Sequence, residues 1–561
     1  MGSVTDSTVI RGGTVVDGTG ASARRADVAF GPDGRIIEIG ENLRGDREID
    51  AGGAVVAPGF IDIHTHYDAQ VFWDPALTPS CFHGVTTVVA GNCGFSIAPI
   101  KPADRERLVA TMEKVEDMDP ATLTEGVTWD FETFPEYLDA VARCRPLLNV
   151  GAYVGHTPVR MHVMGDEASE REATAEEVEA MAAIVGDAMA AGAAGFATSF
   201  GLLHRDGEGR PIPSRFSTRD EVARLAGEVR RAGAGVVAVN GGEGLSFREL
   251  YELQPEIGVP ITFTALLTTD TGAHWKGLEI HRAGRQQGIG VYPQVSCRPL
   301  TFSMSMLDPF TLNTNPVFAE LFGRSVDERR AAYADPAWRQ RALDYWRAGG
   351  PNTLPPRWAA MNVMESASHP ELCGRGLIDI AADRGVDPFD ALLDITIDEP
   401  GLALRVRAVV ANDEAEGITT LLNEEGCVLG LSDAGAHVGQ LCDAPLPTDL
   451  LGNWVRGRNV MSLEQAVHKL TGEPAGLFGF ADRGVLRPGA WADITIFDPA
   501  TVTPGPLRRV RDFPANGERL TADQPDGVRG VYVAGQPVVE DNTITESARS
   551  TPRGQLVRPT P

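Results

Sequence analysis

Short runs of alternating apolar and polar residues occur near both ends of the chain and are typical of β-strands. They lie at residues 8–10, 14–16, 27–30, 35–37, 492–498 and 530–535, with Gly-Gly and Asp-Gly turn signals between the first four. Two β-rich ends around a different middle predict one small β-sandwich domain, built from residues 1–57 and 480–545. Two unrelated β extensions are the alternative.

Between these ends, apolar strand-like runs alternate with helical segments, which is the pattern of a parallel α/β sheet or barrel. The predicted strands are Val55–Ile63, Val85–Ala90, Leu147–Val154, Gly195–Ser199, Val236–Asn240, Ile261–Thr264, Gly290–Gln294, Val406–Val410 and Val428–Leu431. Two helices between them begin with a capping box, at Thr174–Glu177 and Thr218–Glu221. Because nine strands exceed the eight of a closed barrel, we expect at least one to be a loop or an accessory strand.

Two segments depart from this alternation. Residues 301–355 are rich in Phe, Met, Asn and Pro and then become a charged helix around residues 329–347. We predict an insertion here, either a lid over the catalytic face or a structural elaboration. The last residues, 546–561, are polar and rich in Pro and Arg, and we expect them to be disordered.

Charge and composition restrict the partners of the protein. Its 561 residues carry a formal net charge of −27, and so acidic a surface repels the phosphates of nucleic acids and anionic membranes. The seven cysteines are odd in number and scattered, which does not indicate a disulfide framework. We see no apolar run of about 18 residues and no secretory signal, so we expect a cytoplasmic protein and leave homo-oligomerisation open.

The most informative segment is Pro58–His66, which reads PGFIDIHTH. In an extended strand, residues i and i+2 share a face, so the imidazoles of His64 and His66 point the same way, about 7 Å apart. Such a pair can converge on one metal ion. The apolar run before it places both residues at the carboxyl end of a buried strand, where barrel active sites lie.

This segment and the β-rich leader Val9–Gly18 resemble the amidohydrolase superfamily of metal-dependent hydrolases. The resemblance continues, in the superfamily's order, through Gly84–Val89, Leu431–Ala434, Leu470–Ala475, Arg483–Gly489 and Ala492–Ile494. The resemblance implies a distorted (β/α)8 TIM-like barrel over residues 58–479 and a β-sandwich formed by both termini.

Within the superfamily, the chain is similar to the N-acyl-D-amino-acid deacylase, or D-aminoacylase, group. The similar segments are Ala90–Gly94, Gly155–Arg160, Gly195–Leu202 and Val291–Pro293. The resemblance makes Cys93 a metal ligand, and a zinc-bound thiol is deprotonated. It also makes Asp433 a ligand that accepts the proton of the attacking water. The implied zinc ligands are therefore His64, His66, Cys93 and Asp433.

The chain departs from the deacylase pattern at two strands. After Gly258–Ile261 the deacylases carry histidine, including a ligand of a second metal, whereas this chain reads Thr262–Ala265. Where they have a Thr-His pair, it has Val239–Glu243, and Tyr292 replaces a histidine of some members. The remaining donors favour one zinc ion over two.

Other polar residues are candidates for contacts with the substrate. His156 ends a strand and either polarises the substrate, as a catalytic residue, or packs behind the site. His437 could reach the site or cap a helix, and His274 could replace a lost ligand. Tyr292, Glu243 and Arg298 are further candidates, Arg298 as a planar fork for a carboxylate.

Three functions are consistent with these residues. The first is zinc-dependent hydrolysis of a small amide, an N-acyl-D-amino acid above all, with Asp433 acting first as base and then as acid. The second is hydrolysis of a cyclic amide, an imide or another small amide at the same site. The third is a weakly active, metal-bound binding protein, against which the combination of His64, His66 and Asp433 argues.

Overall fold

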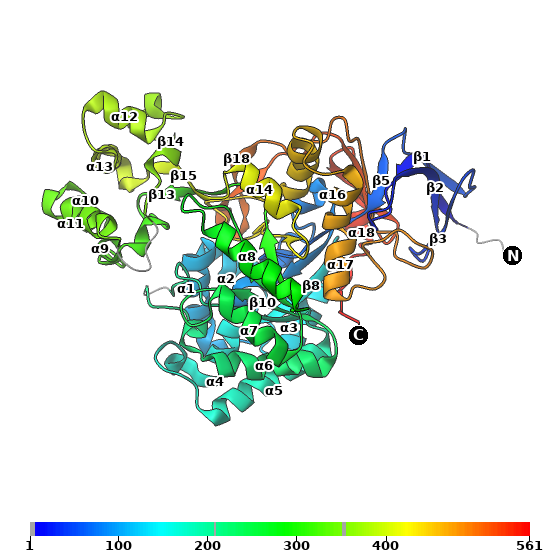
Figure 1. Cartoon of the computed structure of the whole chain (residues 1–561), viewed down its shortest axis with the longest axis horizontal. Helices are drawn as coiled ribbons and strands as arrows, with labels where there is room; N and C mark the ends of the chain where they lie inside the picture. Colours follow the sequence, from blue (N-terminus) through cyan, green and yellow to red (C-terminus); the bar gives the residue numbers. More distant parts are fainter. Residues whose placement is uncertain (1–5, 207–208, 350–354, 561) are drawn as a thin grey trace.

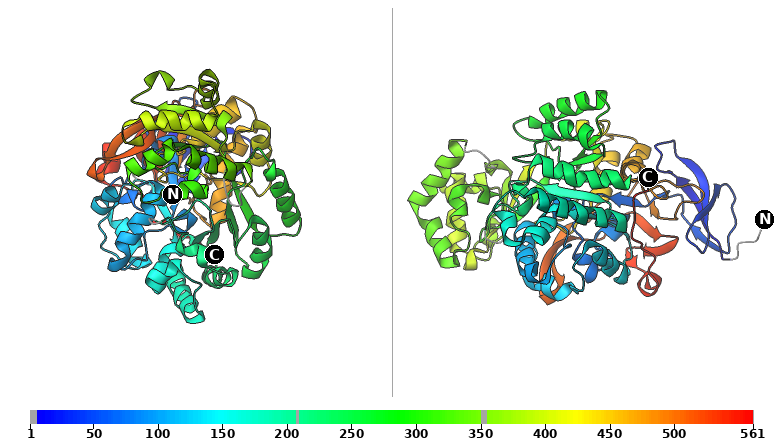
Figure 2. Two further views of the ribbon diagram at one scale, coloured as in Figure 1. Left: turned by 90° about the vertical axis from the view of Figure 1, so that its left-hand side faces the viewer. Right: turned by 90° about the horizontal axis from the view of Figure 1, so that it is seen from below.

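The structure, a computed structural model, describes residues 6–206, 209–349 and 355–560. Residues 1–5 of the predicted sandwich, 350–354 of the predicted insertion and Pro561 of the predicted tail lie outside the described residues. Three parts follow one another across the molecule: a sheet built from both termini, a central barrel, and an inserted unit at the opposite end (Figures 1 and 2).

Eight parallel strands form the central barrel. In spatial order they are β16 (Val428–Leu429), β12 (Val291–Val295), β11 (Ile261–Thr264), β10 (Val236–Asn240), β9 (Gly195–Ser199), β8 (Asn149–Gly155), β7 (Val85–Ala90) and β6 (Phe60–Asp62). A parallel bridge between Thr65 and Ala434 joins the chain beyond β6 to the chain beyond β16, so the two ends of the sheet meet. The predicted (β/α)8 fold is confirmed.

Helices surround these strands because the connections between parallel strands must cross back over the sheet. Their bounds are α1 (Arg105–Glu116), α2 (Pro120–Gly126), α3 (Phe134–Arg143), α4 (His156–Met164), α5 (Ala175–Ala191), α6 (Arg219–Ala232), α7 (Phe247–Ile257), α8 (Ala273–Gln286), α14 (Ala415–Leu422), α15 (Leu446–Asp449), α16 (Leu463–Leu470) and α17 (Gly472–Phe478). No helix among the described residues is both long and apolar enough to cross a membrane.

The two predicted capping boxes differ in the structure. Thr174 and Glu177 exchange both bonds of the motif at the start of α5. At the start of α6, Thr218 accepts a hydrogen bond from the Glu221 amide, but the Glu221 carboxylate binds His156 and Arg160 instead of returning to the cap. A buried arginine and histidine therefore take the carboxylate that the helix start would otherwise use.

Strands from both termini form one nine-stranded sheet, as predicted. They are β1 (Thr8–Val15), β2 (Arg24–Phe30), β3 (Ile36–Gly40), β4 (Arg47–Asp50), β5 (Val55–Pro58), β17 (Ile494–Phe497), β20 (Val528–Val533), β21 (Gln536–Glu540) and β22 (Thr543–Ile544). The chain passes from β5 into the barrel at Gly59, where an added Cβ would lie 2.1 Å from Thr86 Oγ1. The predicted strand Val55–Ile63 is thus two strands in two sheets.

Two predictions about the C-terminal part need correction. The hairpin β18 (Leu507–Phe513) and β19 (Gly517–Ala522) lies outside the terminal sheet and bonds to the loop beyond β16, through Leu520 N and Val438 O. Residues 546–560, expected to be disordered, form α18 (Glu546–Ser550) and then pair with β8, where Val557 N donates to Val150 O. Backbone pairing with a strand orders a polar segment whose composition alone favours disorder.

The inserted unit is larger than predicted. It comprises α9 (Pro316–Ala319), α10 (Val326–Ala334), α11 (Pro336–Arg347), α12 (Leu377–Arg384), α13 (Pro388–Asp398) and a sheet of β13 (Leu300–Ser305), β15 (Arg405–Ala411) and β14 (Met361–Glu365). The predicted barrel strand Val406–Val410 lies in this separate sheet, because it pairs antiparallel with β13 and β14. The insertion therefore extends from residue 300 to residue 411.

The insertion has its own hydrophobic core, centred on Phe318. This buried ring lies 4.9–6.1 Å, centroid to centroid, from four other aromatic rings, those of Tyr333, Trp338, Trp346 and Phe389. We expect Phe318→Ala to destabilise the insertion by about 3–5 kcal/mol, since truncating a buried Phe loses burial and leaves a cavity. In chemical denaturation, the insertion of the variant should unfold at a lower denaturant concentration than that of the parent, while the zinc content is unchanged.

Leu307→Ala is the matched control, because Leu307 is an exposed apolar residue of the same unit. It should shift stability by no more than about 0.5 kcal/mol. Loss of bound zinc in Phe318→Ala would contradict an insertion that is stabilised independently of the barrel.

Candidate metal centre

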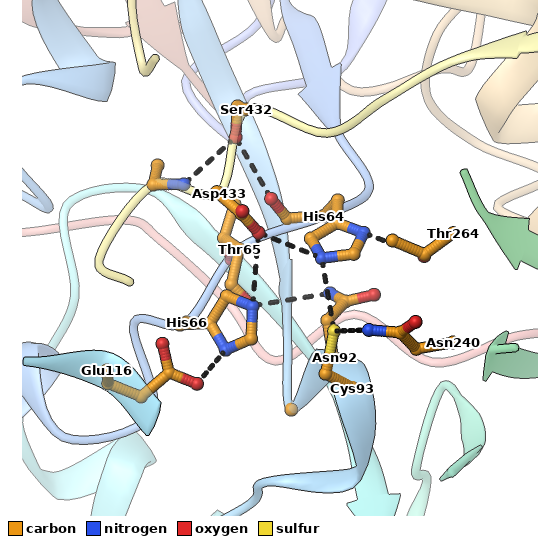
Figure 3. A network of polar contacts seen from close by, with 12 residues as sticks. His64, Thr65, His66, Asn92, Cys93, Glu116, Asn240, Thr264, Ser432 and Asp433 are labelled. Atoms are coloured by element: carbon orange, nitrogen blue, oxygen red, sulfur yellow. Dashed lines mark hydrogen bonds and ion pairs between the residues drawn. The ribbon is translucent and has the colours of Figure 1, made fainter. Parts of the chain in front are cut away.

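Four side chains with metal-binding groups meet at the carboxyl end of the barrel (Figure 3). His64 and His66 follow β6, Cys93 follows β7 and Asp433 follows β16. The ligand atoms of His64, His66 and Cys93 all lie within 4.8 Å of one another. Asp433 Oδ1 lies 3.1 Å from His64 Nε2 and 3.4 Å from His66 Nε2. All four of the predicted ligands are thus brought together.

The Gly91–Gly94 turn explains how Cys93 reaches this point. Gly91 has a φ of +81°, and a Cβ there would lie 2.5 Å from Tyr153 O, so only glycine fits. The Asn92 side chain donates to the carbonyls of Ile63 and Val89, which fixes the turn to both neighbouring strands. Cys93 itself has a φ of +53°, a left-handed conformation that costs a non-glycine residue free energy and is found at functional sites.

Asp433 is held in a similar way. Its φ is +48°, again in the left-handed region. The neighbouring Ser432 hydroxyl donates to His64 O over 3.0 Å and accepts from the Ala434 amide. The loop beyond β16 is therefore tied to the segment after β6 that carries the histidines, and the carboxylate faces them.

A hydrogen bond behind His64 and an ion pair behind His66 orient the two rings. His64 Nδ1 lies 2.7 Å from Gln294 Oε1, an oxygen that can only accept, so Nδ1 carries a proton and Nε2 faces the centre. His66 Nδ1 lies 3.1 Å from Glu116 Oε1, which likewise directs Nε2 to the centre. A carboxylate or amide behind each imidazole is typical of metal centres, where it fixes the tautomer and increases the basicity of the ligand.

The charges at the centre are those of a cation site. Burial alone would lower the pKa of His64, but hydrogen bonds to Asp433 and Cys93 raise it to about 10. Burial opposes ionisation of Cys93 and Asp433, yet the two histidines hold the pKa of the thiol and of the carboxyl below their usual values. Without a metal, protons on the imidazoles balance the anions, and a divalent cation can take their place. Two imidazoles, a thiolate and a carboxylate fit zinc.

Asn240 and Thr264 come from the two segments where the deacylases carry histidine, and each lies beside one of the ligands. Asn240 Nδ2 lies 3.7 Å from Cys93 Sγ, and Thr264 Oγ1 lies 3.3 Å from His64 Nδ1. The amide nitrogen has no lone pair for a metal, and a neutral hydroxyl is a weak zinc ligand compared with imidazole. Asn240 and Thr264 therefore add no strong zinc ligand to the four donors.

Two predicted site residues do not belong to the centre. His156 begins α4 with both ring nitrogens engaged, Nδ1 with Thr198 Oγ1 at 2.8 Å and Nε2 with Glu221 Oε1 at 2.7 Å. It has no nitrogen left for a substrate, so of the two alternatives the structure favours packing behind the site. Tyr292 lies at the other end of the barrel, against the apolar cluster that contains Phe478 and Val557, and is not part of the site.

The remaining candidates have partners of their own. Arg298 Nε donates to Asp443 Oδ1 over 2.6 Å, so its guanidinium already has a carboxylate. Glu243 is exposed in the loop beyond β10. The His437 ring lies between Phe302 and Phe310 of the insertion, 5.3 and 5.1 Å from their centroids. His274 accepts from the Thr269 amide and is not part of the ligand cluster among the described residues.

Sequence reasoning missed Glu116 and Gln294. Gln294 could have been found, because it follows Val291–Pro293 and shares the strand face of residue 292. Glu116, the last residue of α1, carries no signal in the sequence: only tertiary packing brings it to His66.

The contact between Glu116 and His66 gives a prediction. Glu116→Gln should weaken zinc binding about 10–100-fold, because the amide cannot supply the charge that orients and polarises the His66 ring. Competition with a chelator of known affinity measures this. Glu113→Gln, on the same helix but partly exposed, should leave the zinc affinity unchanged, and equal effects of the two variants would contradict a specific role for Glu116.

Residues 47–292 and 376–539 match the amidohydrolase family. The chain belongs to this family and is thus a hydrolase of carbon–nitrogen bonds other than peptide bonds. It is 32% identical to the N-acyl-D-glutamate deacylase of Alcaligenes xylosoxydans xylosoxydans, over 88% of each chain. It is 29% identical to the D-aminoacylase of the same organism, over 96% of this chain and 95% of the relative.

A solved structure with the same fold is that of an N-acyl-D-glutamate deacylase from Bordetella bronchiseptica, in complex with zinc and a phosphonate inhibitor that mimics the tetrahedral intermediate. It is 28% identical to this chain, with a TM-score of 0.69 and coverage of 99% of this chain and 100% of the other.

Proposed function

We propose that this protein hydrolyses the amide bond of N-acyl-D-amino acids with a single zinc ion. The observation that carries the proposal is the cluster of His64, His66 and Cys93 at the carboxyl end of the barrel, with Asp433 Oδ1 within 3.4 Å of both histidine Nε2 atoms. The two deacylase relatives, similar over nearly their whole length, favour this substrate class over cyclic amides and imides.

His64, His66, Cys93 and Asp433 would hold the ion. A bound zinc ion acts as a Lewis acid on a carbonyl and makes a nearby water acidic near neutral pH. Asp433 supplies the proton transfer: its carboxylate accepts a proton from the attacking water and returns it to the departing amine. The side chain of Asp433 is 14% exposed, whereas those of His64 and His66 are 0% and 3% exposed. Of these three, the carboxylate is therefore the group that a substrate can reach.

The side chains beyond this set support a single zinc ion. A second ion beside Cys93 would need ligands from β10 and β11, where the chain supplies Asn240 and Thr264. The Asn240 amide also donates toward the sulfur, so it stabilises the thiolate on that side without a second cation.

The test is elemental analysis of zinc together with hydrolysis of a small panel of amides. The panel contains N-acetyl D- and L-amino acids and simple imides. We expect about one zinc per chain and hydrolysis of the D-amino acid derivatives. Turnover of imides alone would support the second function, and a full zinc complement without any turnover would support a binding protein.

We further propose that the insertion forms one wall of the site, through Phe302 and Phe310 around His437. Phe310→Ala removes an apolar surface, so it should change the ratio of kcat/KM between long and short acyl groups about 10-fold or more while the zinc content stays the same. An unchanged ratio would assign the two phenylalanines a packing role only.

A further inference from the structure

One histidine outside the ligand set lies beside the metal centre. His204 follows β9 and is only 7% exposed. Its ring meets the edge of Phe95, two residues beyond Cys93, at 5.0 Å between centroids. A Cβ built on Gly201 would lie 3.1 Å from His204 Nδ1 and 3.2 Å from Asn240 Nδ2, the amide that reaches Cys93 Sγ. Gly201 therefore lies between His204 and the amide that reaches Cys93, which places His204 toward the sulfur side of the centre.

The hydrogen bonds of Ser199 determine which nitrogen of His204 carries the proton. Ser199 Oγ accepts from the Gly201 amide over 3.0 Å and lies 2.6 Å from His204 Nδ1. The serine proton has no other acceptor among its contacts in the described part of the chain, so the hydroxyl donates to Nδ1. A neutral His204 then has its proton on Nε2.

This Nε2–H is free to act on a ligand. Nε2 has no hydrogen-bond partner among the described residues, and it is not among the polar atoms sealed away from solvent. Burial, assisted by the nearby His437 and His66, lowers the pKa of His204 to about 3 despite the charge of Glu116. The ring therefore stays neutral at physiological pH and presents an oriented donor without a net charge.

We propose that His204 is a catalytic residue whose Nε2–H donates a hydrogen bond to the scissile carbonyl oxygen of the substrate. The assignment rests on the proposed amide hydrolysis. In the tetrahedral transition state that oxygen gains negative charge, and a donor fixed beforehand by Ser199 and Phe95 stabilises the charge without reorganisation. Its place against Phe95 and outside the four donors suits a group that acts on the substrate and does not bind the metal.

The first test is His204→Phe, which keeps a ring against Phe95 and removes the donor. Loss of one such donor typically lowers kcat about 10²–10³-fold. We expect that loss with KM changed only a few-fold and with zinc content equal to that of the parent. His204→Gln, whose amide N–H can take the place of Nε2–H, should recover part of the loss. His162→Phe, at a histidine outside the site, is the matched control and should leave kcat unchanged.

Three results would overturn the proposal. Loss of zinc from His204→Phe would make His204 a metal ligand. A higher KM with an unchanged kcat would make it a group that only binds the substrate, and near-parental kinetics would give it no part in the reaction. These results differ from failure of the proposed function, in which the parent protein itself would cleave no amide of the panel.

Discussion

Asp433→Asn should lower turnover by at least about two orders of magnitude, the low end of what general acid–base catalysis contributes, while the protein remains folded. The substitution keeps the shape of the side chain and an oxygen that can face His64 and His66. It removes the basic carboxylate, and no other described carboxylate lies as close to both Nε2 atoms. The measurement is kcat on an N-acyl-D-amino acid, with zinc content and circular dichroism recorded in parallel.

Cys93→Ser is the informative comparison for this variant. A neutral hydroxyl is a poorer zinc ligand than a thiolate, so the main loss should be in metal affinity. Excess zinc should then restore part of the activity of Cys93→Ser and almost none of that of Asp433→Asn. If Asp433→Asn turned over at a near-normal rate, Asp433 could not be the base.

The double variant His64→Ala/His66→Ala should lose the bound zinc and, with it, all measurable hydrolysis. It removes both nitrogen donors of the centre and leaves a thiol and a carboxylate, which is too few ligands for tight zinc binding. Both rings lie at the carboxyl end of the barrel and not among its apolar layers, so the fold should persist. Elemental analysis after dialysis, with the melting temperature, checks both statements.

The control for this experiment is His162→Ala/His369→Ala. These two histidines lie on α4 and in the insertion, and neither belongs to the ligand cluster. They should keep the parental zinc content. Stoichiometric zinc remaining at the centre of His64→Ala/His66→Ala would remove the basis of the site.

The fold could be predicted where the signal is local. The strands Gly195–Ser199, Val236–Asn240 and Ile261–Thr264 have the predicted bounds. Each is an apolar run between helical segments that is too short to form a helix of its own, so its length favours a buried strand. The run Val406–Val410 has the same composition but lies in the sheet of the insertion. Apolar periodicity marks a buried strand and contains no information about its partners.

The residues of the site could likewise be predicted only where the signal is local. His64 and His66 are two residues apart in the segment directly after β6, so their side chains point the same way as i and i+2 residues of an extended chain do, and the motifs around Cys93 and Asp433 were recognisable as a set. Glu116 and His204 could not be placed, because each reaches the centre from a separate loop or helix end. The prediction for Tyr292 was wrong for a related reason. Residues 292 and 294 share a face of β12, but Gln294 is the one at the carboxyl end, beside His64.

The most direct test of one-zinc amide hydrolysis is a titration of the metal-free protein with zinc, with hydrolysis of the N-acetyl-D-amino acids of the panel as the readout. With a single centre formed by His64, His66, Cys93 and Asp433, activity should rise linearly and reach its plateau at one equivalent of zinc. A plateau only at two equivalents would contradict the single centre, and no hydrolysis at any zinc concentration would contradict the proposed function.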